Sequence, residues 1–276
     1  LSPWQINFFL KKEKYPNKYF INNKVDADHE VDSKALSLAL SLVLQQHSAL
    51  RMCFSFVEPF EFCNVIDFES SDDHVTVKDL SGLNTLSQDV FVDEFVDGDD
   101  VALDLASGIL IRVILFKFGH NKKDQVVIKV HHLVCDKYSL DIIVDDLMFA
   151  YKKIKIGESP KLPDLSVTTL DAAKQIEAFT NSQSLRRELN YWTSLPWAEA
   201  KILQPDHMNV NVSNVTHGQK TIQYELSKSE TNLLMLFLDK NNTIISDFLI
   251  FLAVEAQSQW MGGRCFRVNS VTFGRD

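Results

Sequence analysis

Glycine, cysteine and positive charge are all scarce in this sequence of 276 residues. It contains 9 Gly and 4 Cys, and its 28 Lys and Arg residues are outnumbered by 37 Asp and Glu, which gives a net charge of −9. Because an average sequence has about 7% Gly, the low glycine content argues against an enzyme built on several Gly-rich phosphate loops. The negative charge argues against a nucleic-acid binder, which needs a basic surface to displace counterions from the phosphates.

Cysteine pairs and long apolar runs are missing as well. The four cysteines are widely spaced and form no C-x-x-C pair, so we expect neither a disulfide framework nor a zinc or redox motif. The apolar run at 244–254 is broken by Ser246 and Asp247, and it is shorter than the roughly 20 residues that span a bilayer. We therefore expect a cytoplasmic globular protein without a membrane segment, and no signal-peptide pattern opens the chain.

Apolar periodicity predicts a mixed α/β chain. Strands are expected at 19–25, 51–57, 62–66, 75–80, 109–118, 125–130, 220–226 and 266–272. Helices are expected over 33–44, 86–96, 140–154, 170–179, 185–192, 230–238 and 246–260, with Asp32 and Ser139 as N-caps of the first and third. Residues 158–167 are rich in Ser, Pro and Lys, which is typical of a linker. We place a lobe boundary there, between 1–165 and 166–276.

The pattern with the clearest chemical content is HHLVCDKYS at 131–139, which follows a predicted buried strand. Adjacent side chains on a strand point to opposite faces, so only one of His131 and His132 can face a given cavity. Histidine suits proton transfer near neutral pH, and the carboxylate of Asp136 at the start of a helix can fix the loop. The pattern alone leaves open a structural, a catalytic and a metal-binding role. Metal binding is disfavoured, because no third and fourth ligands follow at a useful spacing.

Five segments, in the same order, resemble the condensation superfamily of nonribosomal peptide synthetases. The superfamily motif HHxxxDG is matched at His131, His132 and Asp136. The other matching segments are LSPWQINFF at 1–9, HSALRMCF at 47–54, Tyr191-Trp192 and Gly274-Arg275. The resemblance implies the chloramphenicol-acetyltransferase-like α/β fold of two lobes. The first lobe, 1–165, would carry the histidine motif, and 166–276 would be the start of an incomplete second lobe.

The resemblance also implies roles for individual residues. His132 is expected to transfer the proton, while His131 supports the loop from inside and Ser139 lies beside them as a further supporting residue. Asp136 is expected to pair with Arg275 across the two lobes, since a partly buried carboxylate without a cation is costly. Residues expected along the substrate tunnel are Tyr138, Ser246 and Val271.

Substrates and partners follow from the same resemblance. The substrate is expected to be an aminoacyl or peptidyl thioester on the phosphopantetheine arm of a peptidyl carrier protein. We expect no metal and no directly bound cofactor. The expected partners are the carrier protein and neighbouring synthetase domains, contacted by a monomeric domain, with no nucleic acid or membrane involved.

Several segments resemble the epimerization branch in particular. They are Phe8-Phe9, Ser139 followed by IIVDDL at 142–147, and RRELNYWTSLPW at 186–197. Epimerization needs acid/base groups on both faces of the α-carbon, and the branch supplies the second from the Glu of an EGHGR segment. Aligned on Gly274-Arg275, Val271 takes the place of that Glu, Phe273 that of the His, and Ser246 that of the usual Asn.

Because Val271 has no proton to exchange, we expect an epimerization-like domain whose activity is impaired. A condensation domain, which joins two carrier-bound aminoacyl groups and needs only the histidine, is the alternative. A carrier-docking domain without catalysis and a coenzyme A acyltransferase of the same fold also stay open. Lys137 replaces the Gly of HHxxxDG, which is expected to remove backbone freedom at positive φ.

Overall fold

The computed structural model describes residues 1–11, 15–27, 30–55, 63–66, 74–119, 122–201, 222–263 and 265–268. The described residues up to Leu185 form one compact unit, and those from Arg186 onward form a second. Within these ranges, no helix combines the length and the apolar character that a membrane span requires.

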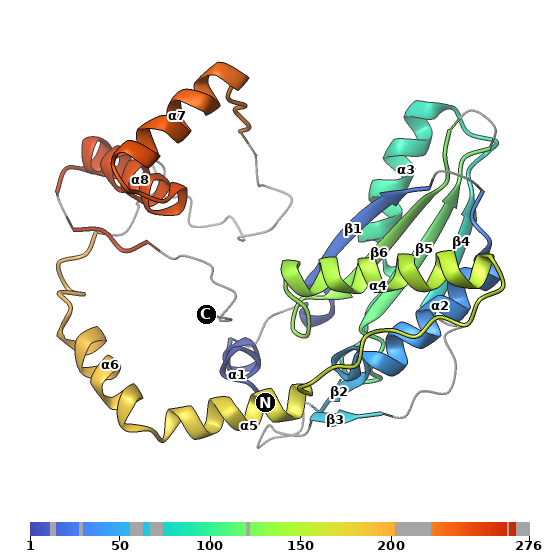
Figure 1. The fold of residues 1–276 in the computed structure, drawn as a ribbon, viewed down its shortest axis with the longest axis horizontal. Coiled ribbons are helices and arrows are strands. Elements are labelled where there is room, and N and C mark those ends of the chain that lie inside the picture. Colours follow the sequence, from blue (N-terminus) through green and yellow to red (C-terminus); the bar gives the residue numbers. More distant parts are fainter. Residues whose placement is uncertain are drawn as a thin grey trace. The chain divides into compact units, whose positions relative to one another are not determined.

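A four-stranded sheet forms the centre of the first unit (Figure 1). Its order is β1 (Phe20–Asp26), β6 (Gln125–His131), β5 (Ile111–Lys117) and β4 (Val75–Asp79). The β1–β6 and β5–β6 pairs are antiparallel, and β4 is parallel to β5. The register places Phe20 opposite His131, so the start of β1 lies beside the histidine motif. A separate antiparallel pair consists of β2 (Met52–Phe54) and β3 (Cys63–Val65).

Helices cover both faces of this sheet, which explains why β5 and β6 carry apolar side chains on both faces. On one face, α2 (Ser33–Gln46) and α4 (Lys137–Lys155) pack on the side chains of Ile111, Ile128 and Val130. On the other face, α3 (Thr85–Asp97) packs on Ile114 and Val127. Neighbouring apolar residues of β5 and β6 belong alternately to the two clusters, because successive side chains of a strand point to opposite faces of the sheet.

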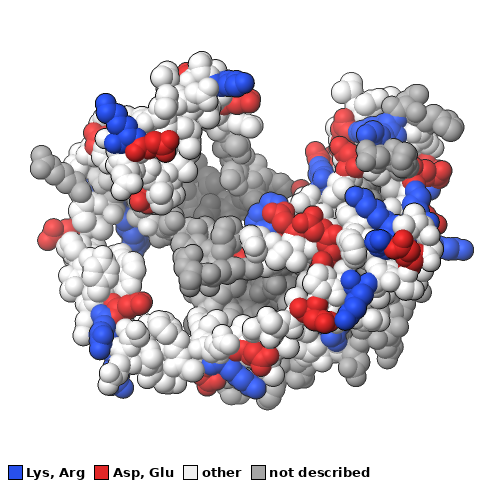
Figure 2. Space-filling view, viewed as in Figure 1, with Lys and Arg blue, Asp and Glu red and all other residues white. Residues whose placement is uncertain are grey.

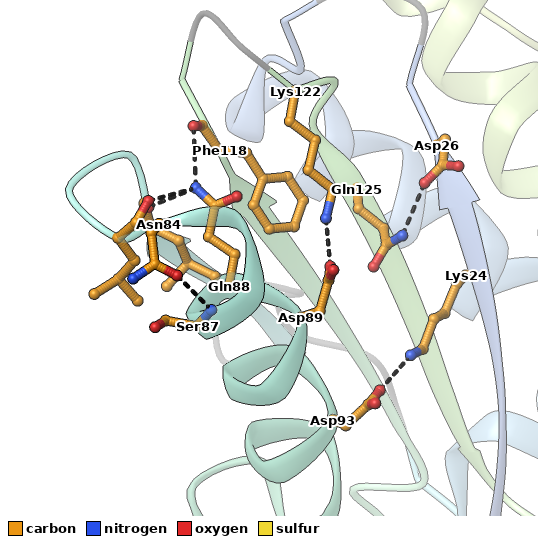
Figure 3. Close-up of polar contacts among 12 residues, drawn as sticks. Lys24, Asp26, Asn84, Ser87, Gln88, Asp89, Asp93, Phe118, Lys122 and Gln125 are labelled. Carbon is orange, nitrogen blue, oxygen red and sulfur yellow. Dashed lines mark hydrogen bonds and ion pairs between the residues drawn. The ribbon is translucent and has the colours of Figure 1, made fainter.

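Polar contacts fix α3 to the strands beside it (Figure 3). Lys24 of β1 pairs with Asp93 at 2.6 Å, and Lys122, which precedes β6, pairs with Asp89 at 2.5 Å. The buried Gln88 donates through Nε2 to the backbone carbonyls of three residues in the loops beside α3, namely Leu80, Leu83 and Phe118. A buried amide needs such partners to offset its desolvation. In the view of Figure 2, positive and negative side chains are interspersed over the first unit rather than gathered by sign.

The N-terminal segment lies against the end of β6. Helix α1 (Pro3–Leu10) begins with a capping box between Ser2 and Gln5. Its Phe8 is buried in a third cluster with Met52, Phe54, Leu105, Leu110 and Leu133. A short 3-10 turn, η1 (Pro16–Lys18), then leads into β1. Two further 3-10 turns are η2 (Ser48–Arg51) and η4 (Asp99–Val101).

Four more helices follow α4. They are α5 (Thr169–Thr180), α6 (Gln183–Ser194), α7 (Lys228–Lys240) and α8 (Ile245–Met261). Helices α7 and α8 touch through Phe237 and Phe248, whose ring centroids are 5.5 Å apart. Residues 158–168, in which the linker was predicted, are neither helix nor strand. The division into lobes at 1–165 and 166–276 stays a prediction.

Two predicted strands of the second half are wrong in their described parts. Residues 222–226 form no strand, and Ile222 and Tyr224 are 96% and 79% exposed. Phe266 makes only an isolated bridge with Lys201. Alternating apolar residues favour a strand only where a neighbouring strand and a packed face are present, and the described residues supply neither at these positions. Positions 220–221 and 269–272 lie outside the described residues.

Candidate active site

His131, the last residue of β6, is fully buried and both of its ring nitrogens are bound. Nε2 lies 2.9 Å from the carbonyl oxygen of Pro16, and Nδ1 lies 3.1 Å from the backbone nitrogen of Leu133. A carbonyl only accepts and an N–H only donates, so the ring is the Nε2–H tautomer with Nδ1 as acceptor. Both bonds fit an uncharged imidazole.

Burial lowers the pKa of His131 to about 4; the hydrogen bond to Pro16 opposes this shift, and the neighbouring His132 adds to it. Desolvation disfavours the charged form of a buried imidazole. At neutral pH His131 is therefore an uncharged side chain that joins the end of β6 to η1, with no nitrogen left to exchange a proton.

His132 is partly exposed and binds the backbone on one side of its ring only. Its backbone N–H donates to the carbonyl of Tyr19 at 2.9 Å, and Nδ1 lies 2.7 Å from the carbonyl oxygen of Cys135. Because that carbonyl can only accept, Nδ1 carries the proton. In the neutral ring Nε2 then holds the lone pair, and it has no hydrogen-bond partner among the described residues. In this tautomer the imidazole of the partly exposed His132 can accept a proton at Nε2.

Two aromatic side chains from the N-terminal segment flank His132. The ring of Tyr19 is stacked on the imidazole, with centroids 5.0 Å apart and an angle of 26° between the planes. Trp4 of α1 lies 6.5 Å away and is tilted by 56°. Sequence reasoning missed Tyr19 and Pro16 as site residues. The antiparallel register of β1 and β6, which brings them to the histidines, is the signal that identifies them.

Asp136 is the N-cap of α4, so the prediction that Ser139 caps a helix starting at 140 is wrong. Oδ1 of Asp136 accepts the backbone N–H of Ser139 at 2.7 Å, and the helix begins at Lys137. The first turn of a helix leaves N–H groups unsatisfied, and a carboxylate both accepts from them and complements the helix dipole. The predicted pairing of Asp136 with Arg275 stays a prediction, because Arg275 lies outside the described residues.

The backbone at Lys137 does not use the freedom at positive φ that is lost when Gly is replaced. Lys137 is the first residue of α4, and Asn242 alone among the described non-glycine residues has a positive φ. The ammonium group of Lys137 pairs with Asp141, one turn further along α4. A lysine is therefore compatible with the backbone at this position.

The remaining predicted site residues are separate from this group. Tyr138 lies on the first turn of α4 and is 52% exposed. Ser246 is the second residue of α8, in the second unit, and is exposed. Val271 lies outside the described residues. The structure thus brings together His131, His132, Asp136, Tyr138 and Ser139 where β6 leads into α4. Among the described side chains, no cluster of three or more His, Cys, Asp or Glu is arranged to hold a metal ion.

Comparison with known proteins gives a family for the chain. The condensation domain family model matches residues 1–276. A linear gramicidin synthase protein of Brevibacillus parabrevis is 29% identical over 247 residues, which are 89% of this chain and 5% of that protein. Surfactin synthase subunit 1 of Bacillus subtilis (strain 168) is 24% identical over 279 residues, which are 100% of this chain and 8% of that protein. The chain therefore spans a small part of the length of these relatives.

Solved structures agree on the fold. The epimerization domain from the third module of tyrocidine synthetase B superposes with a TM-score of 0.83 at 22% identity, covering 95% of this chain and 59% of that one. The starter condensation domain of rhizomide synthetase superposes with a TM-score of 0.60 at 19% identity, covering 72% and 48%. These matches confirm the predicted fold class. As its histidine motif predicted, the chain belongs to the condensation domain family.

Proposed function

We propose that this domain acts on an aminoacyl or peptidyl thioester carried by the phosphopantetheine arm of a peptidyl carrier protein, within a nonribosomal peptide synthetase. The observation that carries the proposal is the bond between Nδ1 of His132 and the carbonyl of Cys135. It leaves the lone pair on Nε2 of a partly exposed ring, which is what a general base requires. The carrier protein and neighbouring synthetase domains are the proposed partners.

The reaction that we favour is an epimerization-like removal of the α-proton by His132. The fold of the tyrocidine synthetase epimerization domain and the epimerization-like segments at 8–9, 142–147 and 186–192 support this branch. A thioester acidifies the adjacent C–H, so one histidine suffices to remove and return its proton. Inversion needs a second acid/base group on the opposite face, and Val271 stands where the epimerization branch has Glu. We therefore propose that the α-proton exchanges with solvent faster than the configuration of the α-carbon inverts.

Peptide-bond formation is the second candidate, and the same Val271 favours it. Condensation requires one group that accepts a proton from the attacking amine while the two substrates are held in position. His132 meets that requirement without a partner at 271. The third candidate function is docking of a carrier protein without turnover.

An assay in deuterated water distinguishes the three candidate functions. The protein is incubated with a carrier protein that is loaded with an L-aminoacyl thioester. Proton removal by His132 replaces the α-hydrogen with deuterium, and chiral analysis of the released amino acid reports inversion. A second loaded carrier protein reports condensation, because a dipeptidyl thioester forms. An absence of both deuterium uptake and dipeptide supports docking alone.

The substitution His132→Asn is the matched test of the base. Its side-chain amide retains a donor for the Cys135 carbonyl but has no basic nitrogen. We expect turnover to fall by about 10²–10⁴-fold, the usual contribution of a general base, and His132→Ala to behave alike. Substitution of His47, which lies at the end of α2 and pairs with Asp146 at 2.7 Å, controls for the loss of a histidine elsewhere. Turnover of His132→Asn within a few-fold of wild type contradicts the role of His132.

A further inference from the structure

Tyr19 makes two independent contacts with His132. Its carbonyl accepts the backbone N–H of His132 at 2.9 Å, and its ring is stacked on the imidazole with centroids 5.0 Å apart. The backbone contact continues the pairing of β1 with β6, in which Phe20 faces His131. The segment that carries Tyr19 is therefore placed by the sheet, not by the histidine itself.

The ring of Tyr19 is itself held in place. On other sides it lies 5.5 Å from the ring of Phe8, which is 6% exposed, and 6.4 Å from that of His131, which is fully buried. Closely packed aromatic side chains have few orientations open to them. The surface that Tyr19 presents to His132 is thus rigid.

The imidazole of His132 needs two constraints to aim Nε2. The torsion that turns a histidine ring is broad and nearly two-fold, so an unsupported ring turns about it freely. The bond from Nδ1 to the carbonyl of Cys135 selects which edge of the ring faces the loop. A single hydrogen bond still lets the ring tilt about the N–O line. The stacked ring of Tyr19 removes that tilt, because it sets the plane of the imidazole.

We propose that Tyr19 is a positioning residue for His132. Its ring holds the imidazole plane, and this plane keeps Nδ1 on the carbonyl of Cys135 and the Nε2 lone pair pointing in one direction. The inference rests on the proposed function, in which Nε2 is the proton acceptor. It also assigns to His132 the Nδ1–H tautomer, which an isolated histidine side chain populates less in water than the Nε2–H form.

Long-range ¹H–¹⁵N correlation spectra of the ¹⁵N-histidine-labelled chain test this assignment without any turnover. His132 is assigned as the signal lost in His132→Asn. At about pH 9, where imidazoles in general are neutral, we expect a protonated Nδ1 and a bare Nε2, with ring protons shifted upfield by Tyr19. A wild-type His132 that is Nε2–H, or an average of both tautomers, overturns the proposal.

The substitution Tyr19→Leu removes the ring but keeps an apolar side chain and the carbonyl, and Tyr19→Phe keeps the ring. We expect wild-type nitrogen shifts in Tyr19→Phe and averaged shifts in Tyr19→Leu, with Tyr19→Met as the second variant if the leucine protein does not fold. Wild-type shifts in the folded Leu or Met variant overturn the proposal.

The loaded-carrier assay supplies the functional readout. Displacement of a catalytic group by about 1 Å costs up to about 10²-fold, so we expect kcat of Tyr19→Leu to be at least about tenfold below that of Tyr19→Phe, with little change in KM. Equal kcat values overturn the positioning role. If His132→Asn retains turnover, the proposed function fails, and the nitrogen shifts still decide whether Tyr19 orients the ring.

Discussion

At the end of β6, His131 has both ring nitrogens bound to backbone groups, whereas His132 has only the ring nitrogen Nδ1 so bound among the described residues. The difference arises from the strand, which points successive side chains to opposite faces. His131 packs against Phe8 and is fully buried, whereas His132 is stacked on Tyr19 and is partly exposed. Position along the strand therefore decides which histidine is structural and which can exchange a proton.

The buried His131 makes stability depend on pH. Its pKa is about 4 in the folded chain, compared with 6.5 for an ordinary histidine. Between these values the unfolded chain binds a proton that the folded chain does not, so the free energy of unfolding falls as the pH decreases through this window. A shift of this size corresponds to about 3 kcal/mol. Above pH 6.5 both states are neutral, and this contribution is constant.

The substitution His131→Gln removes the titration but retains donor and acceptor groups. We expect the variant to be less stable than wild type at pH 7, with a smaller loss of stability on acidification to about pH 4.5. Urea denaturation at the two pH values measures the difference. Parallel pH dependences of the two proteins contradict the buried, uncharged state of His131.

At the scale of elements, the stability of the first turn of α4 is linked to the loop that holds His132. Asp136 caps this turn, and the carbonyl of the preceding Cys135 holds Nδ1 of His132. The cap therefore fixes the backbone that carries the hydrogen-bond acceptor of the imidazole. Loss of the cap is expected to loosen both the helix end and the ring.

The substitution Asp136→Ala removes the cap, whereas Asp136→Asn retains it, since Asn caps as well as Asp. We expect Ala to lower the free energy of unfolding by about 1 kcal/mol through the cap. Any loss in Asp136→Asn reports the carboxylate charge, which acts on the helix dipole and in the predicted pairing with Arg275. Thermal unfolding of the three proteins measures both. Wild-type stability in Asp136→Ala contradicts the cap and the pairing together.

Most elements were predictable because local signals agree with packing. Asp32 caps α2 as predicted, and β1, β5, β6 and α3 lie within a few residues of their expected bounds. The start of α4 was misplaced because Asp136 and Ser139 are both good caps, and the choice between them depends on backbone angles that sequence does not show. The strand at 222–226 failed because pairing is not a local property.

At the scale of the whole molecule, the motif identified the histidine pair but not the residues that hold it. Pro16 and Tyr19 contact the histidines only because β1 lies against β6 at one register. A single sequence shows that two strands are present, but it does not show which of them pair. The roles of Val271, Arg275 and Ser246, carried over from the family resemblance, stay predictions.

The substitution Val271→Glu tests how the second half of the chain contributes. A carboxylate at 271 supplies the acid/base group that the epimerization branch uses opposite the histidine. We expect more D-aminoacyl thioester from Val271→Glu than from wild type, while deuterium uptake at the α-carbon depends on His132 in both. Val271→Gln, of similar size but without a titrating group, is the control. Equal inversion in the Glu and Gln proteins contradicts the proposed reason for impaired epimerization.

The pairing of β1 with β6 has a consequence for synthesis of the chain. Pro16 precedes His131 by 115 residues, so at about 5–20 residues per second β1 leaves the ribosome on the order of 10 s before its partner strand. Until then the nascent chain exposes an unpaired strand edge, a surface that chaperones bind and that aggregates. The histidine site is consequently assembled only after β6 has been made, and until then the nascent chain is open to misfolding.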